Sequence, residues 1–181
     1  MGKNIVILSG SPRKNATTDR LVAAFVEGAE SQGHAVSCFR VADMKIGGCK
    51  ACRHCFEEQG VCVQQDDMSS ILQELRKADV LVFASPIYYF SVSAQLKLAI
   101  DRTYALLKEG MPIKRAALLA TCGDEAEAAA GAVSTFRLIC KYMNWEEAGI
   151  IIAPGLYNPN DIEGREELEQ AKKLGQNIVW S

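Results

Sequence analysis

The 181-residue sequence has almost no excess of charge of either sign, since 20 lysines and arginines stand against 22 aspartates and glutamates, for a formal net charge of −2. A basic surface that would attract nucleic acid is therefore not expected. Long hydrophobic runs are also lacking, and the apolar stretches are far shorter than the roughly 20 residues of a membrane-spanning helix. The sequence does not open with a charged segment, a long apolar core and a cleavage site, as a secretory signal would. We expect a cytoplasmic protein without nucleic-acid or membrane partners.

Histidine is scarce, with two residues in the chain, and no nucleophilic side chain has an evident partner base. The sequence therefore offers no catalytic acid, base or nucleophile of its own. Hydrophobic residues, by contrast, make up 49% of the chain and charged residues 23%, which suits one folded domain with a substantial core. Because no linker, repeat or low-complexity tract divides the chain, residues 1–181 are predicted to form a single domain.

Short apolar runs closed by turn-forming residues predict strands, most of them buried on both faces. Segments with apolar residues on one helical face separate these runs. Strand and helix thus alternate five times, which predicts an α/β fold with a parallel sheet and helices on both sides. The predicted strands are residues 4–8, 35–41, 80–84, 116–120 and 149–153, and the predicted helices are residues 18–33, 68–77, 93–107, 125–143 and 162–179.

The loops that follow the predicted strands contain every unusual feature of the sequence. In an open parallel sheet, ligands bind beyond the carboxyl ends of the strands, near the point where the strand order reverses. These loops are therefore expected to meet at one edge of the sheet and to form the binding site. They are residues 9–18, 41–67, 85–93, 121–124 and 154–161.

The loop at residues 9–18 leads into a helix N-terminus, where free backbone N–H groups and the helix dipole favour an anion. It lacks the G-K-[ST] ending of a Walker A loop and the G-x-G-x-x-G pattern of dinucleotide sites. A polar turn with a threonine cap explains the same composition, but the position after the first strand favours a terminal phosphate. The residues expected to bind it are Ser9, Ser11, Arg13, Asn15, Thr17 and Thr18.

Three consecutive aromatic residues, Tyr88, Tyr89 and Phe90, lie in the loop at residues 85–93. Adjacent aromatic side chains in a loop cannot all point into the core. At least one is expected to line a pocket for a flat ring or to form a partner surface. A loop folded over hydrophobic surface is the alternative interpretation.

Taken together, these segments resemble the NADPH-dependent FMN reductase and iron–sulfur flavoprotein families, which share the flavodoxin-like fold. The similar features are G-S-P-R with a later threonine in residues 10–18, D-D-M at 66–68, S-P-x-Y-x-x-x-x-S at 85–93, and L-K followed by D-R in 96–102. The resemblance implies a doubly wound, five-stranded parallel sheet in the order 2-1-3-4-5. It also implies FMN as cofactor, NAD(P)H as a candidate co-substrate, and a homodimer or homotetramer.

The resemblance also assigns parts of the flavin to loops. The phosphate would lie on the loop at residues 9–18, and the chemistry would take place on FMN itself. Lys97 and Asp101 are four residues apart and are expected to pair on a helix face. Together with Arg102 they are interpreted as structural or interface groups, not catalytic ones. The ribityl chain and ring would lie against Pro86, Ile87, Tyr88, Tyr89, Phe90 and Ser91, with Thr121, Cys122, Gly123 and Asp124 on the other side of the ring.

A cysteine-rich loop at residues 47–63 carries the spacing C-x-x-C-x-x-C, followed after six residues by a fourth cysteine. Four thiolates in so short a segment suit a [4Fe–4S] cluster, and the tight run favours it over zinc, which more often uses two separated pairs. A disulfide or redox-reactive pair is the other alternative, because relatives without a cluster keep some of these cysteines. The candidate metal ligands are Cys49, Cys52, Cys55 and Cys62.

These features predict an FMN-dependent oxidoreductase in which a one-electron cluster exchanges electrons with a flavin, at one edge of the sheet, within a subunit or across a dimer interface. Its donor and acceptor would be small molecules or proteins, including a ferredoxin-like carrier. A cluster-free NAD(P)H-dependent FMN or quinone reductase is the first alternative. A non-catalytic redox sensor, whose cysteine loop reports oxidation, is the second.

Overall fold

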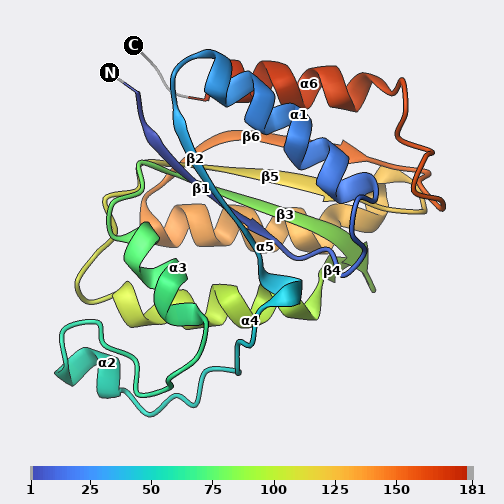
Figure 1. Ribbon diagram of the computed structural model, residues 1–181. Helices are drawn as coiled ribbons and strands as arrows, with labels where there is room; N and C mark the ends of the chain where they lie inside the picture. The colour runs from blue at the N-terminus through green and yellow to red at the C-terminus, as the bar shows by residue number, and fades with distance from the viewer. Residues whose placement is uncertain (1, 179–181) are drawn as a thin grey trace.

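The computed structural model describes residues 2–178 and shows a parallel sheet between two layers of helices (Figure 1). Its strands are β1 (Asn4–Ser9), β2 (Ala35–Arg40), β3 (Val80–Tyr88), β4 (Ser91–Val92), β5 (Arg115–Thr121) and β6 (Glu146–Ala153). The parallel strands follow the order β2-β1-β3-β5-β6, and β4 pairs antiparallel with the end of β3. When the short antiparallel strand β4 is left out of the numbering, this order reads 2-1-3-4-5. The predicted flavodoxin-like order of five parallel strands is therefore confirmed.

The central strands are apolar on both faces because each face packs against helices. In β1, Ile5 and Ile7 belong to one hydrophobic cluster, whereas Val6 and Leu8 belong to the cluster on the opposite face. This alternation follows from the two-residue period of a strand. Every residue of β5 is buried, as expected for a strand inside a parallel sheet.

Two helices cover one face of the sheet and three cover the other (Figure 1). The first pair is α1 (Thr17–Ser31) and α6 (Glu166–Gln176), and the second group is α3 (Met68–Leu75), α4 (Ala94–Arg102) and α5 (Ala130–Met143). Four short helices lie in the connections: η1 (Val41–Asp43), α2 (His54–Glu57), η2 (Thr103–Leu106) and η3 (Ala126–Ala129). None of the helices within residues 2–178 combines the length and apolar character needed to cross a membrane.

Several boundaries differ from the sequence prediction. The helix predicted at 93–107 is divided into α4 and η2, and the one predicted at 125–143 begins with η3. The last helix begins at Glu166 instead of residue 162, while its predicted end at residue 179 lies outside the described residues. Much of the predicted loop at 85–93 is strand, because β3 extends to Tyr88 and turns back into β4.

The cysteine-rich segment does not stay at the carboxyl edge of the sheet. After η1 the chain passes beneath the helical layer, forms α2, and returns to α3 on the side away from the strand ends (Figure 1). There its cysteines lie beside Arg102 and Tyr104, at the C-terminal end of α4 and in η2. The expectation that this segment shares the carboxyl edge with the phosphate loop of the same subunit is therefore wrong.

Candidate functional site

The loop between β1 and α1 has the features of an anion site. Ala16 is the N-cap of α1 and provides no side-chain hydrogen bond to the helix end. The threonine cap that would explain the loop without a ligand is therefore not formed, and the first N–H groups of α1 lack a side-chain cap. Arg13 is exposed beside them. Asn15 has a φ of 55° and donates its N–H to Asp19 at 2.8 Å, which holds the turn in place.

Hydrogen bonds join this loop to two others that the sequence placed at the site. The hydroxyls of Thr18 and Thr121 lie 2.7 Å apart and link α1 to the end of β5. The Ser93 hydroxyl donates to the Gly10 carbonyl at 2.8 Å, and the Gly10 N–H donates to the Ala84 carbonyl at 2.8 Å. The loops after β1, β3 and β5 therefore meet at one edge, as expected from the parallel topology.

The residues at the start of this loop fit the phosphate of a flavin nucleotide. Ser9 and Ser11 are both buried, and the Ser9 Oγ has no hydrogen-bond partner among the described residues. Buried polar groups are nearly always hydrogen-bonded in folded proteins. A buried hydroxyl without a partner, at the start of a loop that leads into a helix end without a side-chain cap, is the arrangement that a polar ligand would complete.

The aromatic segment forms the tip of a β-hairpin with an unusual backbone. Tyr88 pairs with Ser91, and the two residues between them, Tyr89 and Phe90, have φ angles of 47° and 65°. A two-residue turn with both φ angles positive is a type I′ turn, which strongly prefers asparagine and glycine. Their side chains are 98% and 63% exposed, so no core packing explains this conformation. Backbone strain combined with exposed aromatic rings points to a binding surface.

Helix α5 fixes the position of this hairpin. The N–H of Ala132 donates to the Phe90 carbonyl at 3.1 Å. A Cβ at Gly131 would lie 2.4 Å from the same carbonyl oxygen, so only glycine allows this approach. The aromatic tip is therefore held against a rigid element.

The loop after β6 contributes a residue that no sequence motif identifies. A Cβ at Gly123 would lie 3.0 Å from the ring of Tyr157, so this ring lies over the glycine. Tyr157 is 70% exposed, and its N–H donates to Asp161 at 2.9 Å. Its loop, residues 154–161, was among the candidate loops, but no motif identified the tyrosine. Next to Gly123, burial and then Asp124 raise the pKa of the Cys122 thiol above its usual value.

The four candidate metal ligands line one hollow of about 540 Å³. Burial, followed by the proximity of Cys62 and the other two cysteines, raises the pKa of the Cys55 thiol. All seven cysteines are free thiols. Within residues 2–178, no group of three or more His, Cys, Asp or Glu side chains is already arranged to hold a metal ion. The structure thus gathers the four predicted ligands, which are Cys49, Cys52, Cys55 and Cys62, around one space without assembling them into a closed site.

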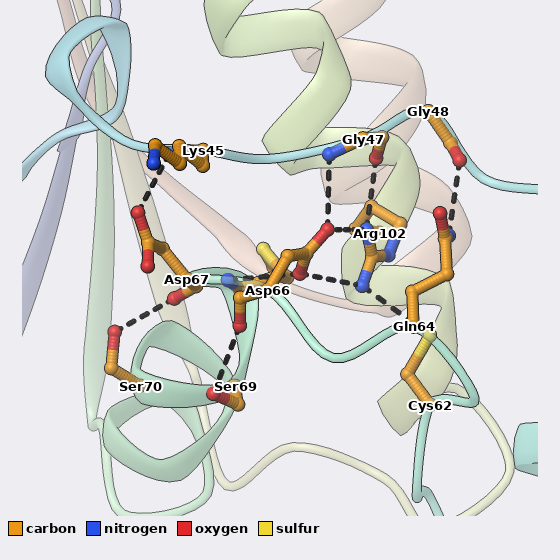
Figure 2. A network of polar contacts seen from close by, with 11 residues as sticks. Lys45, Gly47, Gly48, Cys62, Gln64, Asp66, Asp67, Ser69, Ser70 and Arg102 are labelled. Atoms are coloured by element: carbon orange, nitrogen blue, oxygen red, sulfur yellow. Dashed lines mark hydrogen bonds and ion pairs between the residues drawn. The ribbon is translucent and has the colours of Figure 1, made fainter.

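A buried ion pair anchors this hollow (Figure 2). The guanidinium of Arg102 binds both carboxylate oxygens of Asp66, at 2.6 and 3.0 Å, although its side chain is only 1% exposed. The same guanidinium donates to the Gly47 carbonyl at 2.9 Å and to the Cys62 sulfur at 3.4 Å. Burial alone would raise the pKa of Asp66, but the hydrogen bonds from Arg102 and the Gly47 N–H lower it below its usual value. The structural interpretation of Arg102 is supported, whereas its contact with a cysteine was not foreseen.

Further hydrogen bonds join the two ends of the cysteine segment (Figure 2). Asp67 accepts a hydrogen bond from the Lys45 N–H at 2.7 Å, and the Gln64 side chain donates to the Gly48 carbonyl at 3.1 Å. Lys97 and Asp101, which face solvent on α4, form the predicted i,i+4 ion pair at 2.7 Å.

Helix α4 connects the two regions. Its N-cap, Ser93, binds the carbonyl of Gly10 in the loop after β1, and its last residue, Arg102, binds Cys62. At 1.5 Å per residue, these two positions are separated by about 13 Å along the helix axis. The loop at residues 9–18 and the cysteine hollow are therefore separate regions at the two ends of one helix.

The sequence of this chain is similar to one family model and to several known proteins. The family model of NADPH-dependent FMN reductases matches residues 3–149. An iron–sulfur flavoprotein from Archaeoglobus fulgidus is 32% identical over 176 residues, which cover 94% of this chain and 76% of the relative. A second iron–sulfur flavoprotein, from Methanosarcina thermophila, is 34% identical over 107 residues, which cover 59% of this chain and 56% of the relative. The chain thus spans only about half the length of that relative.

Solved structures confirm the fold. The NAD(P)H:quinone oxidoreductase from Methanothermobacter marburgensis superposes with a TM-score of 0.78 at 20% identity and covers 100% of this chain and 98% of its own. An azoreductase from Bacillus anthracis superposes with a TM-score of 0.73 at 17% identity, covering 96% of this chain and 99% of its own. At such identities the likeness concerns the fold alone.

Proposed function

The chain belongs to the NADPH-dependent FMN reductase family and is an FMN-dependent oxidoreductase, and from this premise we propose that it is of the iron–sulfur flavoprotein type. In this proposal it couples FMN at the carboxyl edge of the sheet to a [4Fe–4S] cluster in the cysteine hollow. The observation that carries the proposal is that the three cysteines of the C-x-x-C-x-x-C run and the fourth cysteine that follows them all line one hollow. The relatives named iron–sulfur flavoprotein support it.

The flavin site is assigned to the three loops joined by hydrogen bonds. The uncapped N-terminus of α1 would bind the phosphate, and Arg13 would add charge. The strained hairpin would lie against the flavin ring, with Tyr157 as an addition from the structure. The proposed FMN-binding residues are Ser9, Ser11, Arg13, Asn15, Thr17, Thr18, Pro86, Ile87, Tyr88, Tyr89, Phe90, Ser91, Thr121, Cys122, Gly123 and Asp124.

The chemistry belongs to the bound groups, since a flavin accepts one or two electrons and an iron–sulfur cluster accepts one. The protein binds and orients them. The residues after β1 hold an anion, while the hairpin and Gly123 present surfaces to a flat ring. Cys49 and Cys52 are exposed, so the hollow is open to a small-molecule or protein partner, including a ferredoxin-like carrier.

A cluster-free NAD(P)H-dependent FMN or quinone reductase is the second candidate. The observation that favours it is that no group of three or more candidate ligands within residues 2–178 is already arranged to hold a metal. The solved neighbours named as quinone oxidoreductase and azoreductase agree with this alternative. In that case the strained hairpin would bind the flavin ring and the oxidant, and the cysteines would be structural or redox-reactive.

We propose a homodimer or homotetramer in either case. A groove of about 370 Å³ between η2 and α5 is bordered by exposed side chains, of which Tyr104, Leu138 and Tyr142 are 50%, 63% and 73% exposed. Large apolar side chains gathered on one face are typical of an association surface. Size-exclusion chromatography with light scattering measures the assembly, and a monomer would contradict this part of the proposal.

Anaerobic purification followed by iron, sulfide and FMN quantification tests the function. About four iron and four sulfide per subunit are expected with FMN. Serine variants of Cys49, Cys52, Cys55 and Cys62 should lose iron but retain FMN. Cys38→Ser is the matched control, because Cys38 is also exposed but lies on β2, outside the cysteine segment. FMN without iron in the wild-type protein would refute the cluster and favour the second candidate.

A further inference from the structure

Arg102 is a buried cation, and four of the five N–H groups of its guanidinium are hydrogen-bonded. Its guanidinium has five N–H groups. Two are taken by the carboxylate of Asp66, one by the Gly47 carbonyl and one by the Cys62 sulfur. The fifth, on Nε, is buried and has no partner among the described residues. All four terminal N–H groups are therefore directed at residues at, or just beyond, the two ends of the cysteine segment.

These contacts join residues that are distant in the sequence. Gly47 lies before the first cysteine of the segment, and Cys62 is the last. The Asp66 carboxylate also accepts the Gly47 N–H at 3.0 Å, so the ion pair clamps both polar groups of this glycine. The planar fork of arginine makes this possible, because lysine has no bidentate geometry to offer a carboxylate.

We propose that Arg102, fixed by Asp66, is a positioning residue of the cysteine site: it ties Gly47 to Cys62 and donates a hydrogen bond to the Cys62 sulfur. This inference rests on the proposed function, in which Cys62 is a cluster ligand. A hydrogen bond to a ligand sulfur stabilises the more negative, reduced state of an iron–sulfur centre and raises its reduction potential. Arg102 thus sets both the shape of the cysteine hollow and the potential of the loaded site.

The Arg102→Lys variant tests this role, because it keeps the positive charge and removes the fork. The expected result is a midpoint potential shifted to more negative values in a reductive titration of the purified holoprotein, followed by visible and electron paramagnetic resonance spectra. Arg76→Lys is the matched control. Arg76 also binds a carboxylate with its guanidinium, that of Glu109 at 3.2 Å, and donates to the Gly60 carbonyl in the same segment, but among the described residues it forms no hydrogen bond with a cysteine sulfur. Its potential should equal that of the wild type.

Asp66→Glu is a second variant in case Arg102→Lys does not fold. It keeps the ion pair but displaces the guanidinium by about one methylene, so the potential should shift in the same direction. Folding of each variant is checked by its FMN content. A wild-type potential in the folded Arg102 and Asp66 variants would overturn the hydrogen bond to the Cys62 sulfur.

Hydrogen exchange of the cluster-free protein separates this inference from the proposed function. Arg102→Lys should accelerate exchange several-fold at residues 45–48, whereas Arg76→Lys should not. If the wild-type protein holds no iron, the cluster proposal fails, and accelerated exchange in Arg102→Lys would still support the positioning of the segment. Unchanged exchange at residues 45–48 would overturn the positioning role whether or not iron is present.

Discussion

Replacing Tyr89 by glycine is predicted to stabilise the FMN-free protein, although the change removes a large side chain. Tyr89 has a φ of 47°, and the left-handed conformation costs a residue with a Cβ roughly 1–2 kcal/mol. Glycine avoids this cost, but its greater freedom in the unfolded chain lowers the free energy of unfolding by roughly 0.5–1 kcal/mol. Because the side chain is 98% exposed, no packing is lost. The net effect is a stabilisation of about 0.5–1 kcal/mol.

Thermal unfolding of the FMN-free protein measures this effect. For a chain of this length, 1 kcal/mol corresponds to roughly 2–4 °C in Tm, so Tyr89→Gly should raise Tm by about 1–4 °C. FMN must be absent, since a ligand that binds the native state raises Tm by itself. Ala23→Gly is the control, because Ala23 is exposed in the interior of α1, where glycine costs about 1 kcal/mol more than alanine. The two variants should shift Tm in opposite directions.

The same substitution should weaken FMN binding if the hairpin contacts the flavin ring. An aromatic contact contributes about 1 kcal/mol, so the Kd for FMN should rise roughly fivefold. A variant that is more stable without FMN and binds it less tightly would show that the turn stores strain for a binding purpose. A Tm equal to or below that of the wild type in the FMN-free Tyr89→Gly protein would refute the strain argument.

Three further changes test other parts of the site. Ser9→Ala removes a buried hydroxyl that lacks a partner, so the FMN-free protein should lose no stability by chemical denaturation, while the Kd for FMN should rise about fivefold by fluorescence titration. Gly131→Ala puts a Cβ 2.4 Å from the Phe90 carbonyl oxygen and should lower stability by about 1–3 kcal/mol, although alanine favours helices. Asp66→Asn leaves Arg102 buried without its counter-charge and should cost on the order of 3 kcal/mol at neutral pH. Because the folded pKa of Asp66 lies below its usual 3.8, this difference from the wild type should persist above pH 3.8 and shrink as the pH falls below it, as measured by urea unfolding.

The sheet could be predicted from the sequence because its signal is local. Strands buried on both faces are short apolar runs, and their alternation with helices leaves few parallel topologies. The position of the loop at residues 9–18 follows from this topology, since the loop after β1 has to lie at the carboxyl edge of the sheet. The hairpin was missed because the pair Tyr89 and Phe90 carries none of the asparagine and glycine signal of a type I′ turn. The segment was therefore expected to be a loop instead of the end of β3 and β4.

The direction of the cysteine segment could not be predicted, because the contacts that determine it are not local. The end of β2 lies beside the end of β1, but a connection of more than twenty residues can leave that edge in either direction. Its course depends on the pair between Arg102 and Asp66, 36 residues apart in the chain. No sequence pattern distinguishes Asp66 from Asp67, of which one binds a buried arginine and the other a backbone N–H. Because the hollow lies at the far end of α4, the cluster and the flavin of one subunit would not share one edge of the sheet. The interface between two copies is then the predicted place at which cluster and flavin exchange electrons.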